Sequence, residues 1–300
     1  MRQSRTRPAT GSLPGVSPPD PDEQRAASRE SWEGAADAWG RRANQVREWG
    51  MPVSVALIDA IGLQPGQRVL ELAAGPGDTG FMAAELIAPG GTLVSSDGAE
   101  AMLEVGRRRA AEAGLHNVEF QQLELEWIDL PTASVDAVLC RWGIMLIVDP
   151  AAAAHEVRRV LRAGGRAAFA VWGERDRNPW ATLPNMVLVK LGLAEPMDSD
   201  APGSMFSLAG ESRLTELLQN AGFTDVAVQA VTVVRAYDAI EQFVAETAEM
   251  SPSFSVAFRE LSAEQQATVA DGIAAAAAPF IAADGSVRLP GSSLVASAGA

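Results

Sequence analysis

The sequence predicts an α/β fold built on a doubly wound, mostly parallel β-sheet. Between about residues 65 and 173, short apolar runs alternate with amphipathic segments at helical spacing, the pattern of repeated strand–helix units. Glycine or aspartate follows most of these runs, as is typical of turns at strand ends. Hydrophobic residues make up 47% of the chain and charged residues 21%, enough for a large core, which excludes wholesale disorder and a coiled coil.

Two regions precede this alternation. Residues 1–28 are rich in Pro, Ser and Arg with almost nothing apolar to bury, so we expect a disordered tail. From Arg29 on, apolar residues recur at helical spacing, and Trp32 and Trp39 share one face of a predicted amphipathic helix. Residues 52–61 predict a second helix. We therefore treat residues 29–64 as an N-terminal helical segment.

The segment 65–173 carries the regular part of the predicted sheet. Its expected strands are 68–73, 92–96, 118–122, 135–140 and 166–172. Its expected helices are 79–87, 99–113 and 151–162. The last helix is preceded by Asp149-Pro150, an N-cap followed by a first-turn proline. The order strand, helix, strand predicts parallel pairing.

Residues 174–300 follow a looser pattern of loops, helices and strands. The expected elements are a helix over 211–221, a strand over 225–235, helices over 239–249 and 262–278, and a strand over 285–296. We expect this part to complete the sheet and to cover the substrate.

Charge and cysteine content restrict the partners. The formal net charge is −14, which repels a phosphate backbone and argues against nucleic acid. Cys140 is the single cysteine, so an internal disulfide or multi-cysteine metal site is excluded, and we expect no metal. The sequence shows no secretory signal and no apolar run long enough for a membrane helix, so we expect a cytoplasmic protein without a membrane partner, as a monomer or homodimer.

The segment 69–80 carries the main motif, a strand followed by a glycine-rich turn. Gly75 and Gly77 permit a tight turn and let a ligand approach bare backbone. With Gly80 they also spell the dinucleotide fingerprint of nicotinamide-dependent oxidoreductases, a weak signal alone. Glu71, inside the strand, would oppose a pyrophosphate and would suit a ligand with an ammonium or sulfonium charge, although it is also readable as an ordinary strand-end carboxylate.

This motif resembles the first motif of class I S-adenosylmethionine-dependent methyltransferases. The likeness extends to Asp97 after the second strand, to the 130–136 segment before the fourth strand, and to Val160-Leu161-Arg162-Ala163-Gly164-Gly165. It is closest to the small-molecule branch that includes the ubiquinone/menaquinone-biosynthesis enzymes and secondary-metabolite methyltransferases. Two positions depart from the family: Ala73 replaces a glycine, and Glu124 replaces the commoner Asp.

The resemblance implies a seven-stranded Rossmann-like methyltransferase fold with helical lid insertions, and S-adenosyl-L-methionine as cofactor. It places the ribose hydroxyls at Asp97 and the adenine edge at Glu124. The predicted cofactor-binding residues are Glu71, Ala73, Gly75, Gly77, Asp97, Gly98, Met102, Glu124, Leu125, Arg141 and Trp39. Asp97 is also readable as a helix N-cap alone, Glu124 as a solvated loop charge, and Trp39 as helix packing.

The predicted acceptor site is less well defined. Trp142, Trp172, Trp180 and Tyr237 are candidates for contact with the substrate, and each has core packing as its alternative. His155 is the one candidate for a catalytic base, although a helix such as 151–162 usually presents such a residue to solvent. Cys140 is expected to be a small buried hydrophobe.

These observations predict methyl transfer to an oxygen or carbon of an apolar small molecule, in secondary metabolism. Two alternatives stay open: a methyltransferase-fold protein that catalyses a non-methylating reaction, and a nicotinamide-dependent oxidoreductase. A nucleic-acid methyltransferase is disfavoured by the acidic charge and by Cys140-Arg141-Trp142-Gly143, which stands where the adenine-specific signature would be.

Overall fold

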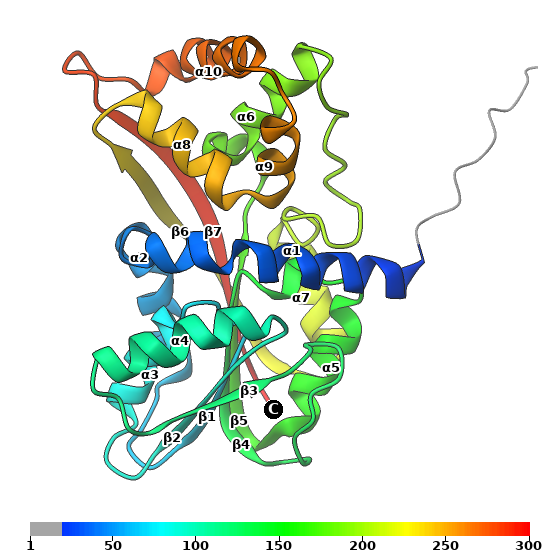
Figure 1. The fold of residues 1–300 in the computed structure, drawn as a ribbon. Coiled ribbons are helices and arrows are strands. Elements are labelled where there is room, and N and C mark those ends of the chain that lie inside the picture. The colour runs from blue at the N-terminus through cyan, green and yellow to red at the C-terminus, as the bar shows by residue number, and fades with distance from the viewer. Residues whose placement is uncertain (1–19) are drawn as a thin grey trace, which may run out of the picture.

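A seven-stranded sheet with the strand order β3-β2-β1-β4-β5-β7-β6 organises the protein (Figure 1). The computed structural model describes residues 20–300. The strands are β1 (Arg68–Leu72), β2 (Thr92–Asp97), β3 (Val118–Gln122), β4 (Val135–Arg141), β5 (Leu161–Trp172), β6 (Thr224–Tyr237) and β7 (Val287–Gly299). β1 to β5 pair in parallel, and β7 runs antiparallel to both of its neighbours. The predicted seven-stranded, mostly parallel sheet is confirmed.

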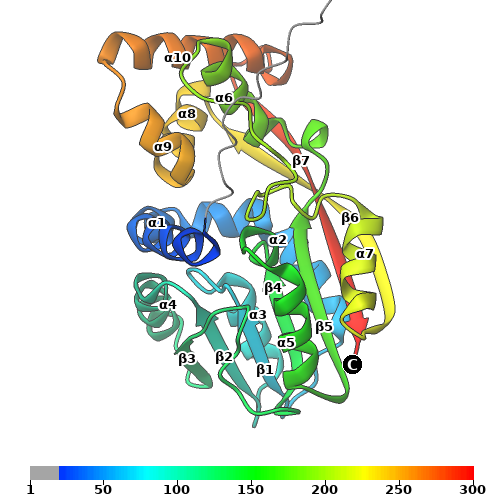
Figure 2. The ribbon, with the colours of Figure 1, turned by 90° about the vertical axis from the view of Figure 1, so that its right-hand side faces the viewer.

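Helices cover both faces of this sheet, as a doubly wound fold requires. The helices are α1 (Pro21–Arg41), α2 (Ala43–Ile61), α3 (Asp78–Leu86), α4 (Glu100–Glu112), α5 (Pro150–Val160), α6 (Pro179–Lys190), α7 (Glu211–Asn220), α8 (Ile240–Met250), α9 (Pro252–Arg259) and α10 (Ala263–Ala277). Figure 2 shows α5 and α7 side by side over one face, with α2 and α3 on the other. No helix among residues 20–300 is long and apolar enough to span a membrane.

The central strands are buried on both faces. Val69, Leu70 and Leu72 of β1 have no exposed surface, and neither do Val138 and Leu139 of the adjacent β4. A strand covered by helices on both faces reads as a continuous apolar run rather than an alternating one, which is why the sequence predicts these strands well.

The strands β6 and β7 continue past the rest of the sheet as a two-stranded ribbon. β5 ends at Trp172, which pairs with Ser293, whereas β6 and β7 stay paired as far as Tyr237 and Val287. The helices α6, α8, α9 and α10 gather around the far part of this ribbon (Figure 1). This ribbon lobe has its own apolar core, which contains Val187, Leu188, Tyr237, Phe243, Phe254, Val269, Ile273, Val287 and Leu289.

α1 and α2 lie between the ribbon lobe and the parallel sheet (Figures 1 and 2). α2 contacts β4, β5, β6 and β7 as well as α3, and it runs along one face of the sheet from Trp142, after the end of β4, to Arg166, which donates to the Ala60 carbonyl oxygen. That the two helices act as a lid stays a prediction.

Three expectations about the elements are wrong. The tail predicted over residues 1–28 ends early, because α1 begins at Pro21 with Asp20 as its N-cap; residues 1–19 of that prediction lie outside the described residues. The second helix begins at Ala43 rather than at Pro52, which lies inside it. The helix predicted over 151–162 ends at Val160, because residues 161–165 already belong to β5, with Leu161 paired to Val135.

Candidate functional site

The loop between β1 and α3 has the left-handed backbone that its glycines predict. Gly75 has a φ of 54° and Gly77 a φ of 92°, and α3 begins at the next residue, Asp78. Ala73 also adopts a positive φ, 49°, which is a strained conformation for a residue with a side chain. No heavy atom lies within 4 Å of the place where a Cβ would stand on Gly75. One side of the loop therefore presents open backbone, which a ligand can approach.

Asp97, the last residue of β2, fastens this loop to the sheet. Its Oδ2 accepts a hydrogen bond from the Gly75 backbone N–H at 2.9 Å, and its Oδ1 accepts one from the Ala99 N–H at 3.0 Å. Burial raises the pKa of the Asp97 carboxyl to about 6. The Asp97 carboxylate thus contacts the glycine loop, and Asp97 is not the N-cap of α4, because that position is occupied by Ala99.

Glu71 lies beneath the loop rather than on its open side. Its Oε1 accepts a hydrogen bond from the Gly80 N–H at 2.7 Å, and its Oε2 accepts one from the Ser95 hydroxyl at 3.3 Å. The residue is 3% exposed, and burial raises its pKa to about 7. Its carboxylate is committed to the first turn of α3, so direct contact of Glu71 with a ligand stays a prediction.

Arg141, at the end of β4, brings a buried positive charge to the same loop. Its Nη2 lies 3.5 Å from Asp78 Oδ2, and its guanidinium lies 4.8 Å from the ring of Trp142. Its Nη1 is buried and has no hydrogen-bond partner among residues 20–300. Burial lowers the pKa of Arg141. A buried, unpartnered guanidinium nitrogen is suited to a ligand carboxylate.

On the other side of Asp97, the predicted adenine edge lies next to α1. Glu124 Oε1 pairs with the Arg29 guanidinium at 2.5 Å, and a Cβ on Gly98 would stand 3.3 Å from Glu124 Oε2. A cavity of about 630 Å³ adjoins Glu124 and Arg29. Leu125 and Met102 are both buried, and Met102 packs in the apolar contact between α1 and α4. Met102 therefore packs between α1 and α4, and its predicted contact with the cofactor stays a prediction.

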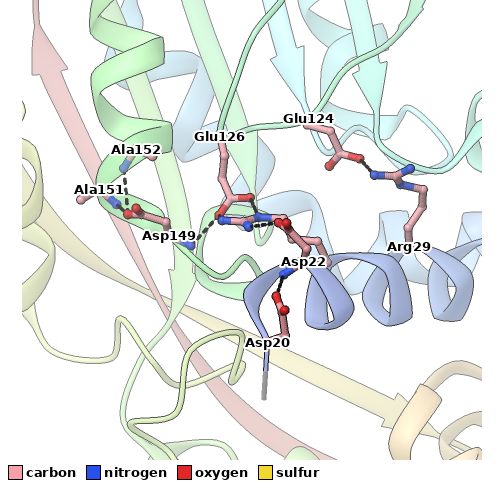
Figure 3. A network of polar contacts seen from close by, with 9 residues as sticks. Asp20, Asp22, Arg29, Glu124, Glu126, Asp149, Ala151 and Ala152 are labelled. Carbon is pink, nitrogen blue, oxygen red and sulfur yellow. Dashed lines mark hydrogen bonds and ion pairs between the residues drawn. The ribbon is translucent and has the colours of Figure 1, made fainter. Parts of the chain in front are cut away.

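α1 is held over these strand ends by polar contacts, shown in Figure 3. Arg25 donates to both carboxylate oxygens of Glu126, at 2.6 and 3.1 Å, and Glu126 also accepts from the Asp149 N–H at 2.7 Å. Further along α1, Glu33 accepts hydrogen bonds from the Glu100 and Ala101 N–H groups and so caps α4, which lacks a cap of its own.

The predicted acceptor residues gather next to Arg141. Trp142 stacks on Trp49, at a centroid distance of 5.2 Å, and on Trp172, at 4.3 Å, and the rings of Trp49 and Trp172 lie 6.3 Å apart. Trp180 meets the ring of Trp172 at 4.7 Å. Tyr237 lies in the ribbon lobe and donates its hydroxyl to a buried carboxylate of α8. The structure thus brings the three predicted tryptophans together, in a stack that also forms part of the core.

Two predicted residues lie elsewhere. His155 is exposed on α5, the helix that covers the face opposite α2 and α3, so the structure does not support it as a catalytic base. Trp39 is half-buried, and its Nε1 donates to the Met250 carbonyl oxygen at 3.4 Å. Its indole therefore joins α1 to the ribbon lobe.

Sequence reasoning missed three residues of this region: Trp49, Arg235 and Glu246. All three are buried or half-buried at the junction of α2, β6 and α8. One signal was available, because Glu246 shares the apolar face of its helix with Phe243 and Met250. A charge in such a stripe indicates a buried polar contact.

Comparisons with known proteins agree with this geometry. A family model described as "Methyltransferase domain" matches residues 63–222. The demethylmenaquinone methyltransferase of Clavibacter sepedonicus is 34% identical over 164 residues, which are 55% of this chain and 61% of that protein. The ubiquinone/menaquinone biosynthesis C-methyltransferase of Pasteurella multocida is 28% identical over 178 residues, 56% of this chain and 66% of the relative. The chain thus spans less than two thirds of these curated relatives.

Among solved structures, the YcgJ protein from Bacillus subtilis has the same fold. The TM-score is 0.53 at 18% sequence identity, and the match covers 82% of this chain and 96% of that one. Similarity at this identity concerns the fold alone.

Proposed function

Because this chain belongs to the methyltransferase-domain family, we propose that it is an S-adenosylmethionine-dependent methyltransferase that acts on an apolar small molecule. The observation that carries the proposal is the arrangement around the open glycine loop. Asp97 holds the loop on one side, and Arg141 lies beside Asp78 at the start of α3, with its unpartnered Nη1 next to Gly50 of α2. These two side chains would hold opposite ends of an amino-acid nucleoside.

The residues fit such a cofactor in charge and in hydrogen-bonding capacity. Arg141 Nη1 is a donor for the amino-acid carboxylate. Asp97 already accepts two backbone hydrogen bonds, but an ionised carboxylate has about four acceptor sites, so two remain for ribose hydroxyls. The Glu71 carboxyl group, held beneath the first turn of α3, is poorly suited to a pyrophosphate, and this disfavours the oxidoreductase alternative.

When bound, the cofactor supplies a methyl group on a positively charged sulfur. The protein has to orient the acceptor and exclude water, and orientation alone is worth up to about 7–11 kcal/mol in well-aligned systems. α2 contacts both the tryptophan stack and Arg141, because it places Trp49 on Trp142 and Gly50 against the Arg141 guanidinium. A side chain at position 50 would collide with the Arg141 guanidinium.

We further propose that the methyl group goes to an oxygen or carbon of the acceptor, in secondary metabolism. The stacked tryptophans beside Arg141 support an aromatic or otherwise apolar acceptor. The names of the relatives, which are C-methyltransferases of quinone biosynthesis, support carbon as the receiving atom. The net charge of −14 argues against a nucleic-acid acceptor.

The test is calorimetry of S-adenosylhomocysteine binding to the purified full chain. We expect binding by the unaltered protein, a loss of at least tenfold in affinity for Asp97→Ala, and a loss of similar size for Arg141→Met. Glu119→Ala is the matched control, since Glu119 is an exposed carboxylate on β3 paired with Arg68.

Binding of NAD in place of S-adenosylhomocysteine would move the assignment to the oxidoreductase alternative. Binding of S-adenosylmethionine without release of S-adenosylhomocysteine, across a panel of aromatic acceptors, would favour the non-methylating one.

A further inference from the structure

A buried ion pair joins β6 to α8 in the ribbon lobe, next to Trp49 of α2. Arg235, near the end of β6, donates from Nη1 to Glu246 Oε1 of α8 at 3.2 Å. The Arg235 side chain is 11% exposed and that of Glu246 is 2% exposed. The Tyr237 hydroxyl donates to the same Oε1 at 2.9 Å, and burial raises its pKa, so this hydroxyl stays protonated. Oε1 is thus shared by two donors.

The Arg235 guanidinium also lies between two indole rings. Its central carbon is 4.0 Å from the ring centroid of Trp49 and 3.5 Å from that of Trp180. Trp49 stacks on Trp142, which is in contact with Arg141 beside the glycine loop. An unbroken series of contacting side chains therefore connects the proposed cofactor site with the buried ion pair.

Three polar atoms of this cluster have no hydrogen-bond partner among residues 20–300. They are Nε1 of Trp49, Nε of Arg235 and Oε2 of Glu246. An unsatisfied buried polar group is costly, and native proteins leave few of them. Here two donors and one acceptor occur together on side chains that touch one another, next to flat aromatic surfaces. This combination is what a polar, planar ligand would complete.

We propose that Trp49, Arg235 and Glu246 form the polar end of the acceptor site, and that the acceptor is a planar aromatic molecule carrying a hydroxyl next to a carbonyl oxygen. The hydroxyl donates to Glu246 Oε2, and the carbonyl oxygen accepts from Arg235 Nε or Trp49 Nε1. The ring packs on the stacked indoles. This inference rests on the proposed function and names its substrate class.

The location agrees with where open α/β sheets bind ligands, at the crevice outside the carboxyl ends of the strands. Trp142 follows the end of β4 and Trp172 is the end of β5, so the stack lies on the half of the sheet next to the cofactor loop. The long ribbon brings Arg235 to this stack from beyond the end of β5, since Arg235 pairs with Leu289 whereas Trp172 pairs with Ser293.

The experiment is a titration of tryptophan fluorescence with two probes, in the presence of saturating S-adenosylhomocysteine. Alizarin carries a hydroxyl next to a carbonyl on a planar ring system, and anthraquinone has the same rings and carbonyls without a hydroxyl. We expect Glu246→Gln to weaken alizarin binding at least tenfold and to leave anthraquinone binding unchanged. Glu249→Gln, on the exposed side of the same helix, is the control that should change neither.

A second variant tests the donor side without touching Glu246. Trp49→Phe keeps an aromatic ring but removes Nε1, so it should weaken both probes by similar factors. Equal alizarin affinity in the unaltered protein and in Glu246→Gln would overturn the inference. S-adenosylhomocysteine binding measured on the same samples separates the two proposals. If it is retained while the probe result fails, only the acceptor site is refuted, and if it is lost in the unaltered protein, the proposed function falls with it.

Discussion

Ala73 and Gly143 touch across the gap between the loops that follow β1 and β4, and only one of the two positions has room for a side chain. A Cβ on Gly143 would overlap the Cβ of Ala73 and would come within 3.1 Å of Cys140 Sγ. Ala73 itself has a φ of 49°. The departure from glycine at position 73 is therefore accommodated by a glycine on the neighbouring loop.

We expect Gly143→Ala to destabilise the protein by about 1–3 kcal/mol, because overpacking forces the two loops apart. Adding Ala73→Gly should recover most of that loss, since it removes the Cβ that is in the way. Urea unfolding of both single variants and the double variant measures the coupling. Strictly additive free energies would show that the contact is not responsible.

Ala73→Gly alone should be neutral or should stabilise the protein by up to about 1.5 kcal/mol. Relief of the left-handed backbone is worth about 1–2 kcal/mol, and the extra freedom of glycine in the unfolded chain offsets about 0.5–1 kcal/mol of it. The same urea series provides this value. A loss greater than about 1 kcal/mol would mean that the Ala73 methyl group packs more tightly than its strain costs.

The buried carboxyl of Glu71 should make the stability of the protein fall as the pH rises. Its pKa is raised from 4.5 to about 7, so the folded protein holds a proton that the unfolded chain has already released. The contribution is fully present below pH 4.5 and is lost as the pH passes through about 7.

We therefore expect the unfolding free energy of the unaltered protein to drop relative to that of Glu71→Gln between pH 5 and pH 7, by roughly 1–3 kcal/mol. Urea unfolding at several pH values measures the difference. The pKa of Asp97 is also raised, to about 6, but Asp97 is present in both proteins, so its contribution cancels in the difference between their unfolding free energies. Parallel curves would show that Glu71 ionises normally in the folded state.

Glu126→Ala should loosen α1 from the sheet. Glu126 is buried and accepts three hydrogen bonds, two from Arg25 and one from the Asp149 N–H, so removal leaves those donors without an acceptor. We expect a loss of about 2–4 kcal/mol and faster amide hydrogen exchange in residues 21–41. Asp22→Ala, which removes an exposed partner of Arg25, should change stability by less than about 0.5 kcal/mol. Unchanged exchange in α1 would refute the role of this contact.

Ser293→Ala should destabilise the protein, because it removes the hydrogen-bond acceptor of the Trp142 indole N–H. The Ser293 hydroxyl accepts from Trp142 Nε1 at 3.0 Å and donates to the Val171 carbonyl oxygen at 2.8 Å, all in the buried interior. We expect a loss of about 1–3 kcal/mol. Ser292→Ala, at the half-buried neighbouring position, is the control and should be nearly silent. Equal effects of the two substitutions would indicate a general backbone effect rather than loss of the Trp142 contact.

The parallel part of the fold was predictable because strands that are buried on both faces consist mostly of apolar residues, and such runs are visible in the sequence. Three of the four residues from Val69 to Leu72 are apolar and a glycine turn follows, and β4 has a comparable apolar run from Ala137 to Cys140. α1 was harder, since residues 21–28 are mostly polar and are held by contacts with distant residues such as Glu126. Composition cannot reveal a helix stabilised in this way.

Some residues of the candidate site were predictable from local sequence motifs, and others were not, because only the tertiary structure brings them together. Gly75 and Asp97 belong to local motifs, and the structure joins them by a hydrogen bond. Arg235 and Glu246 come from separate elements and meet through the ribbon, a juxtaposition that depends on strand register and helix packing. Residue types and spacing alone do not contain that information.

The position of β7 between β5 and β6 also constrains how the chain is made. β7 follows β6 in the chain but is an interior strand, so β6 has no partner in the sheet until residues 287–299 have been synthesised. Until then one edge of β5 and both edges of β6 are unpaired, so the nascent protein has to be protected from aggregation.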